Sequence, residues 1–174
     1  MLIRTATLGD AEQIRKLILE NVVARDSNSP GLVEYETFTI PEIERLIDDN
    51  PFFYVVVENQ QVIAFLSNYT NERIRQLPKD PMINHLLSLD SKFIYSELAV
   101  SREGYRRQGF VKQLFHKLFQ DAHSNNFTEI YSCVSHHPLR HQPSINLLTK
   151  LGFQFLEEFD MKSGLVFGKY KKEI

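Results

Sequence analysis

The residues best suited to chemistry lie in and just after an apolar stretch near the middle of the chain. Residues 93–100 have the pattern of a strand that is apolar or aromatic apart from Ser96 and Glu97. A carboxylate on such a strand is costly unless it is hydrated, paired or functional. Glu97 is therefore the candidate general base, since a carboxylate can take a proton from an attacking group. The alternative is a structural ion pair with a nearby Arg or Lys.

A loop that combines glycines with arginines follows this strand and leads into a predicted helix. The loop contains Arg102, Gly104, Arg106, Arg107 and Gly109. The first amide groups of a helix have no helical acceptor, and the helix dipole adds partial positive charge at the same end. Both effects favour an anion bound at the start of a helix. Guanidinium groups strengthen the hold on phosphates. The loop therefore predicts a phosphate site, with a surface arginine cluster at a helix end as the alternative.

The spacing within this loop separates it from the common nucleotide-binding motifs. It lacks the Gly-Lys-Ser/Thr of a P-loop and the Gly-x-Gly-x-x-Gly of a dinucleotide fold. Arg106, Gly109 and Val111 occupy the positions of a Q/R-x-x-G-x-G/A pattern, and the loop thus resembles the signature of the GCN5-related N-acetyltransferase (GNAT) superfamily. Val111 departs from that pattern, because it places a branched side chain where the family has Gly or Ala.

A second segment resembles the same family. Residues 144–153, Ser-Ile-Asn-Leu-Leu-Thr-Lys-Leu-Gly-Phe, are similar to the family's A-x-x-L-Y-E-K-L-G-F. The family tyrosine, which often protonates the leaving thiolate, falls on Leu148. Leucine cannot donate a proton, so the general acid lies elsewhere in this chain or the role is unfilled.

The order of predicted elements also matches the GNAT fold over nearly the whole chain. Strands are expected at residues 2–6, 52–57, 62–66, 93–100, 129–134, 153–159 and 165–170, the last two joined by a turn at 162–164. Helices are expected after Thr7, from Pro41, within 71–90, from Phe110 and over 144–151, with loops at 25–31 and 135–143. This order predicts an α/β fold with a mixed sheet and helices on both faces. The resemblance implies a mostly antiparallel sheet, splayed between the fourth and fifth strands, in a single N-acetyltransferase domain over residues 1–174.

The resemblance implies acetyl-CoA as co-substrate and a primary amine as acceptor, with direct attack on the thioester. In the family the pantetheine arm joins the open sheet like an added strand. The residues implied in cofactor binding are Leu98, Ala99, Val100, Arg106, Arg107, Gln108, Gly109, Phe110, Val111 and Asn146. The amide of Leu98 or Ala99 is the candidate donor to the oxyanion. Asn146 facing water is the alternative to a cofactor contact.

Other side chains compete for the acid and base roles. His136 is the alternative to Glu97, with His137 and His141 beside it in the predicted loop, because histidine titrates near neutral pH. Tyr131 and Tyr105 are candidate acids in place of the missing tyrosine. Solvated loop histidines and core packing of Tyr131 are the structural alternatives. No metal is expected, since no Cys cluster or helical His pair accompanies these histidines.

Composition limits the remaining classes of function. The chain has 174 residues, 43% of them hydrophobic, and a net charge of −2, which disfavours a nucleic-acid binder. The single cysteine, Cys133, excludes an internal disulfide, and no apolar run reaches the ~18 residues of a membrane span. We expect a cytoplasmic enzyme that acts on a small-molecule or peptide amine, without a nucleic-acid or membrane partner. A homodimer is left open, and a non-catalytic acyl-CoA-binding regulatory domain is the alternative function. The loops at residues 25–39 and 71–90 should set the acceptor, and they contain no motif that identifies it.

Overall fold

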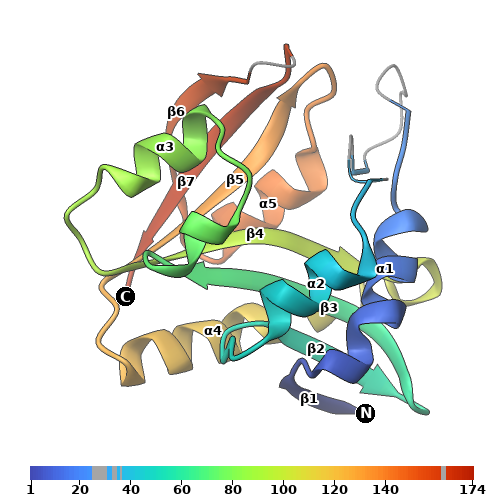
Figure 1. Ribbon diagram of the computed structural model, residues 1–174. Helices are drawn as coiled ribbons and strands as arrows, with labels where there is room; N and C mark the ends of the chain where they lie inside the picture. The colour runs from blue at the N-terminus through green and yellow to red at the C-terminus, as the bar shows by residue number, and fades with distance from the viewer. Residues whose placement is uncertain (25–30, 33–34, 36, 162–163) are drawn as a thin grey trace. The chain divides into compact units, whose positions relative to one another are not determined.

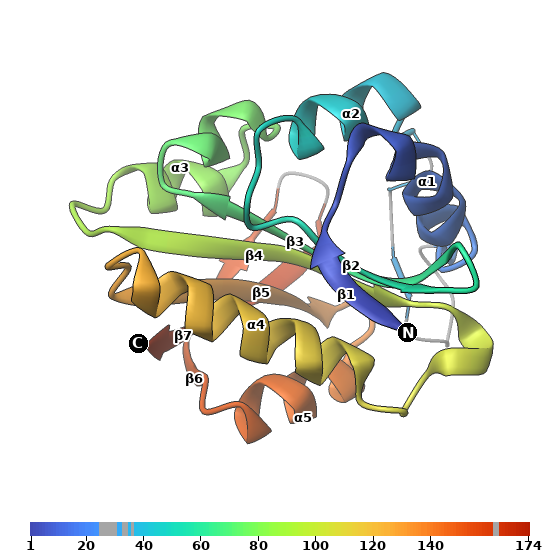
Figure 2. The same ribbon diagram turned by 90° about the horizontal axis from the view of Figure 1, so that it is seen from below.

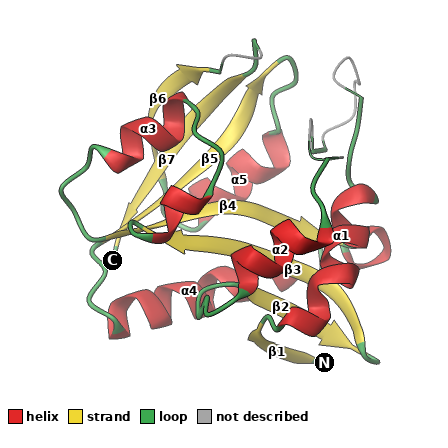
Figure 3. Cartoon of the chain, in the orientation of Figure 1, coloured by secondary structure: helices red, strands yellow, loops and turns green. Residues whose placement is uncertain are grey.

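The computed structural model describes residues 1–24, 31–32, 35, 37–161 and 164–174. Its helices are α1 (Ala11–Leu19), α2 (Ile40–Ile47), α3 (Pro81–Leu87), α4 (Phe110–Ser124) and α5 (Gln142–Lys150). Its strands are β1 (Leu2–Thr5), β2 (Tyr54–Glu58), β3 (Gln61–Thr70), β4 (Phe93–Ser101), β5 (Glu129–His137), β6 (Gln154–Asp160) and β7 (Val166–Glu173) (Figures 1 and 3). Within the described residues, no helix has the length and apolar character needed to cross a membrane.

The strands form one mixed sheet in the order β1-β2-β3-β4-β5-β7-β6. The β1–β2, β2–β3, β5–β7 and β6–β7 pairs are antiparallel, and the β4–β5 pair is parallel. This confirms the predicted α/β fold with a mostly antiparallel sheet. The parallel pairs run from Phe93–Glu129 to Ser96–Ser132, although β4 continues to Ser101 and β5 to His137. The pairing thus ends where the resemblance implies that the fourth and fifth strands separate.

The chain divides into two compact units. Unit 1 comprises residues 1–25, 31–68 and 98–118, and unit 2 comprises residues 26–30, 69–97 and 119–174. Strands β3 and β4 each contribute residues to both units. The single N-acetyltransferase domain over residues 1–174 stays a prediction.

Unit 1 has helices on both faces of its strands. In Figure 2, α1 and α2 lie on one face of β1–β3, and α4 lies on the other. The core between these two helices and the strands includes Ile14, Leu17, Ile43, Val55 and Phe65. The predicted cap at Thr7 is confirmed: Thr7 forms a capping box with Asp10 at a 3-10 turn, Leu8–Asp10, that leads into α1. Helix α2 begins at Ile40, one residue before the predicted Pro41, and Thr39 forms a capping box with Glu42. These caps satisfy amide groups that the first helical turn leaves without acceptors.

Unit 2 also has helices on both sides of its strands. The views in Figures 1 and 2 place α3 and α5 on opposite faces of β5, β7 and β6. Helix α3 is the short helix predicted within residues 71–90. Asp80 caps it by accepting a 2.7 Å hydrogen bond from the Ile83 amide, and Pro81 takes the first helical position.

Strands β3, β5 and β7 extend beyond their predicted ends, and β7 runs to Glu173. The extensions of β3 and β5 carry polar residues. Strand β3 continues from Leu66 to Thr70, and β5 continues from Val134 to His137. Polar side chains in these extensions have partners inside the protein, which is why the chain can keep them in a buried strand. The predicted loop at residues 25–31 lies outside the described residues except for Gly31, and so do Lys162 and Ser163 of the predicted last turn.

Candidate active site

Glu97 lies in β4 of unit 2 with a carboxylate that is poised to accept a proton. Its Oε2 atom is buried and has no hydrogen-bond partner among the described residues. Burial raises the pKa of Glu97 to about 7, although a hydrogen bond from the Tyr69 side chain opposes the rise. A carboxylate with a pKa near the working pH combines basicity with a useful ionised fraction. The environment therefore suits the predicted role of general base.

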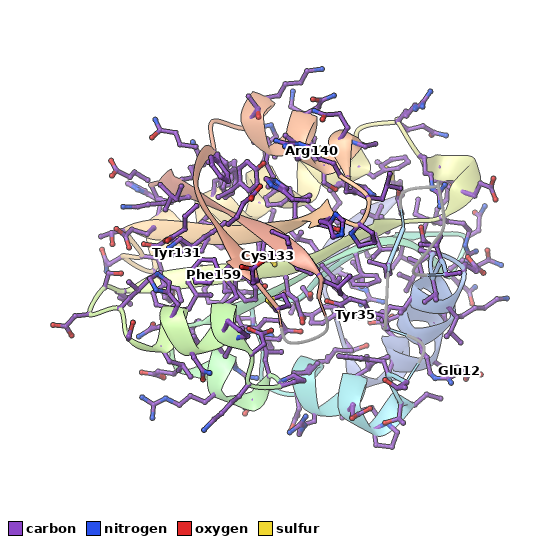
Figure 4. All side chains as sticks on the ribbon, turned by 90° about the horizontal axis from the view of Figure 1, so that it is seen from above. Glu12, Tyr35, Tyr131, Cys133, Arg140 and Phe159 are labelled. Carbon is purple, nitrogen blue, oxygen red and sulfur yellow. The ribbon has the colours of Figure 1, made fainter. Side chains whose placement is uncertain are left out.

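An acidic residue and a thiol share the surroundings of Glu97. The charge of Asp80, at the start of α3, contributes to the raised pKa of Glu97. Burial raises the pKa of the Cys133 thiol to about 12, and its sulfur lies 2.8 Å from the Tyr95 hydroxyl. Cys133 is therefore a protonated thiol near neutral pH and not a nucleophile. Figure 4 labels Cys133 and Phe159 on the strands of unit 2 and Arg140 on the side of α5.

A buried lysine fixes α3 to the strands of the same unit. Lys169 in β7 is 4% exposed, and its Nζ atom lies 2.7 Å from His85 Nε2 and 2.6 Å from Glu157 Oε1. The ammonium group also lies 5.9 Å from the ring centroid of Tyr131 and 5.4 Å from that of Phe159. These contacts join the C-terminal half of α3 to three strands, while its N-terminal residue Asp80 lies within electrostatic reach of Glu97.

The predicted phosphate loop lies in unit 1 and is open to solvent. Gly109 has a φ angle of 85°, and a Cβ atom placed there would meet no heavy atom within 4 Å. Gln113 donates the first bond of α4 to the Gly109 carbonyl, 3.0 Å away. The amides of Phe110, Val111 and Lys112 come before that bond, so the helix itself gives them no acceptor. Exposed amides of this kind are what the predicted phosphate site requires.

The loop is held in shape by its own side chains and by α1. The Gln108 side chain donates to the Gly104 carbonyl at 3.0 Å, and Arg106 donates to Asn21 Oδ1 at 2.8 Å. Arg107 has a positive φ angle of 63°, which turns the chain sharply before Gly109. The side chains of Arg106, Arg107 and Gln108 are exposed. All three predicted contacts to a diphosphate thus lie on the surface of the loop.

The residues that end β4 present backbone groups from a firmly packed strand. The side chains of Leu98 and Val100 are buried in the core of unit 1, and Ala99 between them is exposed. The Leu98 amide donates a 3.0 Å hydrogen bond to Ser67 Oγ, which belongs to β3. Of the two predicted oxyanion donors, Leu98 therefore has its amide engaged inside the protein.

The histidines do not gather into a site. His136 lies in β5 and not in the predicted loop, with Nδ1 2.6 Å from Glu158 Oε1 and Nε2 3.0 Å from the Tyr170 hydroxyl. Its ring fills the space over Gly168, where a Cβ atom would overlap it. His141 accepts a 3.3 Å hydrogen bond from the Ser144 amide at the start of α5. His136 as the alternative base stays a prediction, and its two ring nitrogens already have partners.

The other predicted residues have local partners. Tyr131 donates a 3.0 Å hydrogen bond to Glu129, and burial raises the pKa of Tyr131 to about 12. Asn146 is exposed and accepts a 2.8 Å hydrogen bond from Gln142. The side chain of Leu148, at the position of the family tyrosine, is buried. In the described part of the chain, no three His, Cys, Asp or Glu side chains are grouped so that they could hold a metal ion.

Comparisons with known proteins identify the family of the chain. The model of the acetyltransferase (GNAT) family matches residues 18–153 of the chain. The chain belongs to this family. The match includes β4, the predicted phosphate loop, α4 and α5, and it confirms the predicted resemblance to the family. A comparison with curated proteins finds no match.

Solved N-acetyltransferases share the GNAT fold over nearly their full length. An N-acetyltransferase from Staphylococcus aureus Mu50 superposes with a TM-score of 0.68 and 17% identity, covering 99% of this chain and 97% of that one. Ard1 from Thermoplasma volcanium gives 0.71 and 14%, with coverage of 99% and 97%. A NatC complex bound to Gag peptide and CoA gives 0.68 and 14%, with coverage of 99% and 98%. At these identities the likeness shows the fold alone.

Proposed function

We propose that this chain is an N-acetyltransferase that moves the acetyl group of acetyl-CoA to a primary amine by direct attack on the thioester. The observation that carries the proposal is the Glu97 carboxylate: it has a buried Oε2 atom without a partner among the described residues and a pKa of about 7. A carboxylate kept only for structure would be expected to have both oxygens paired. Membership of the GNAT family supports the reaction class.

Glu97 has the role of proton acceptor. An alkyl ammonium ion has a pKa of about 10.4 and cannot attack a carbonyl until it loses a proton. Glu97 Oε2 takes that proton, directly or through one water molecule, and the free amine then attacks the thioester carbon. The Tyr69 side chain donates to Glu97 and fixes the direction of the carboxylate. This part of the mechanism needs an ionised Glu97, so it operates above the pKa of that group.

The loop before α4 has the role of holding the cofactor. Acetyl-CoA supplies the acetyl thioester, and its diphosphate fits the open backbone at Gly109 and the first amides of α4. Arg106 and Arg107 add charge at this point. A solved neighbour of the same fold is bound to CoA, which supports acyl-CoA as the ligand class. The exposed Asn146 is the proposed contact from α5.

For the oxyanion and the leaving group we propose one backbone donor and no side-chain acid. The Ala99 amide is the proposed oxyanion donor, because the Leu98 amide already donates to Ser67. A thiol such as that of coenzyme A has a pKa near that of Cys, about 8.5, so it leaves as a thiolate without a strong acid. We propose that no side chain replaces the missing tyrosine. Tyr131 suits the role poorly, since its pKa of about 12 exceeds that of the thiol it would protonate.

The test is coenzyme A release, followed with a thiol reagent, from acetyl-CoA and a panel of amines. The panel should contain small amines and short peptides with free N-termini, since both classes present a primary amine. Release that depends on an amine, with a matching acetylated product, supports the proposal. Tight binding of acetyl-CoA without release from any amine would overturn it and favour a non-catalytic acyl-CoA-binding domain.

A further inference from the structure

One contact of the phosphate loop reaches outside the loop, to the end of α1. Arg106 donates a 2.8 Å hydrogen bond to Oδ1 of Asn21, a residue far from it in sequence. Arg106 is exposed, and its side chain would otherwise sample many rotamers. A partner that holds the guanidinium in one position reduces the entropy lost when a phosphate binds to it.

Asn21 is itself fixed by two further contacts. Its Nδ2 atom donates to the Leu17 carbonyl at 2.8 Å, which directs Oδ1 toward Arg106. Its own carbonyl accepts from the Leu32 amide at 2.9 Å, and the Val23 amide donates to the Leu32 carbonyl at 2.8 Å. At Gly31, a Cβ atom would lie only 2.7 Å from the Asn21 carbonyl oxygen, so the chain packs tightly there. Asn21 is thus a rigid acceptor and not a mobile surface group.

We propose that Asn21 is a positioning residue that holds Arg106 in place for the diphosphate of the cofactor. The inference rests on the proposed function, because it assumes that the loop binds coenzyme A. Asn21 touches neither the acetyl group nor the acceptor in this role. Its effect reaches the ligand only through Arg106, and only a ligand that carries phosphates should respond to it.

The experiment measures the affinity of coenzyme A and of pantetheine, which lacks the diphosphate, for wild type, Asn21→Ala, Arg106→Ala and the double variant. Asn21→Ala should weaken coenzyme A binding about 3- to 10-fold, the usual effect of losing one side-chain hydrogen bond. The affinity for pantetheine should not change. In the Arg106→Ala background the same substitution should have no further effect, because the two residues act as one.

Asn125→Ala is the matched control. Asn125 makes the same kind of contact at the end of α4, where its Nδ2 atom donates to the Asp121 carbonyl at 2.8 Å. Its coenzyme A affinity should stay close to wild type even if its melting temperature falls. A loss as large as that of Asn21→Ala would show that a loosened helix end, and not Arg106, explains the effect, and would overturn the inference.

The remaining outcomes separate the inference from the proposed function. Additive losses in the double variant, or an equal loss for pantetheine, would overturn the role of Asn21 while leaving the phosphate loop intact. Wild-type protein that does not bind coenzyme A would overturn the proposed function as well.

Discussion

Glu97 shows how a few neighbours set the pKa of a buried carboxylate near neutral pH. Burial alone favours its neutral form, and the negative charge of Asp80 acts in the same direction. The hydrogen bond from Tyr69 favours the ionised form. Their balance leaves the pKa of Glu97 at about 7, where a small change in any neighbour changes the ionised fraction strongly.

Glu97→Gln should keep acetyl-CoA affinity and lower kcat/KM by about 10²–10⁴-fold, the usual loss on removing a general base. In wild type, activity should rise with pH through about 7, because Glu97 must be ionised to accept the proton. The variant should lack this acidic limb, and its deficit should shrink at high pH, where the amine loses its proton unaided. The measurement is a pH series of kcat/KM with one identified amine. A variant with the same acidic limb as wild type would move the role of base to His136.

Tyr69→Phe should shift the acidic limb to higher pH. The substitution keeps a ring at a position that is 1% exposed and removes the hydrogen bond that favours ionised Glu97. The pKa of Glu97 then rises, by about one pH unit if the bond has the usual strength of one to a charged group. Activity should therefore fall at pH 7 and recover by pH 9. An unshifted limb, measured at saturating acetyl-CoA, would show that Tyr69 does not control the base.

Glu97 and Tyr69 differ in how well the sequence predicts them. Glu97 is predictable, because a lone carboxylate within an apolar strand is unusual. Tyr69 is not, since Ser-Asn-Tyr-Thr after an apolar run reads as the end of a strand. Asp80 could have been identified as a helix cap from the Asp-Pro pair at the start of α3, but its proximity to Glu97 depends on how the chain folds.

At the scale of elements, the turn before α4 contains two residues with positive φ angles, Arg107 and Gly109. Gly109→Asp should remove the thermal stabilisation that coenzyme A gives, because it places a negative group where the diphosphate belongs. At a ligand concentration near 100 Kd, that stabilisation should be roughly 5–10 °C in wild type. Gly109→Asn is the control, since Asn tolerates a positive φ angle and carries no charge. A shift that survives in the Asp variant would exclude this loop as the phosphate site.

The attachment of helix α3 to the strands of unit 2 depends on the buried side chain of Lys169. Lys169→Met keeps an unbranched apolar chain against the rings of Tyr131 and Phe159 and removes both hydrogen bonds of the ammonium group. Amide hydrogen exchange in α3 should then be roughly tenfold faster, which corresponds to the loss of about one such bond. Exchange in α1, which lies in the other unit, should stay as in wild type. Unchanged exchange in α3 would show that its apolar residues alone hold it.

The sequence predicts the elements better than it predicts their ends. Hydrophobic spacing and capping residues locate all five helices of the described chain, because these signals are local. The ends of β3 and β5 are missed, because Ser67, Asn68 and His136 belong to strands only through distant partners. Asn68 donates to the Phe52 carbonyl at 2.6 Å, and His136 contacts Glu158 and Tyr170. A local sequence pattern does not predict hydrogen-bond partners that are distant in the chain.

At the scale of the molecule, the boundary between the two units crosses β3, β4 and α4. Unit 2 ends in β4 at Glu97, and unit 1 begins again at Leu98. In β3 the boundary lies between Asn68 and Tyr69. Each of these two strands is therefore shared by both units.

The chain should accordingly unfold in a single transition. Melting either unit would remove residues from two strands that the other unit also uses, so a half-folded state should be unstable. Calorimetry should give equal calorimetric and van't Hoff enthalpies, near 120 kcal/mol for 174 residues at about 60 °C. Coenzyme A should move this one transition to higher temperature without splitting it, since the ligand binds only the folded chain. Two resolved transitions, or a calorimetric enthalpy well above the van't Hoff value, would contradict the single domain and show that the units unfold independently.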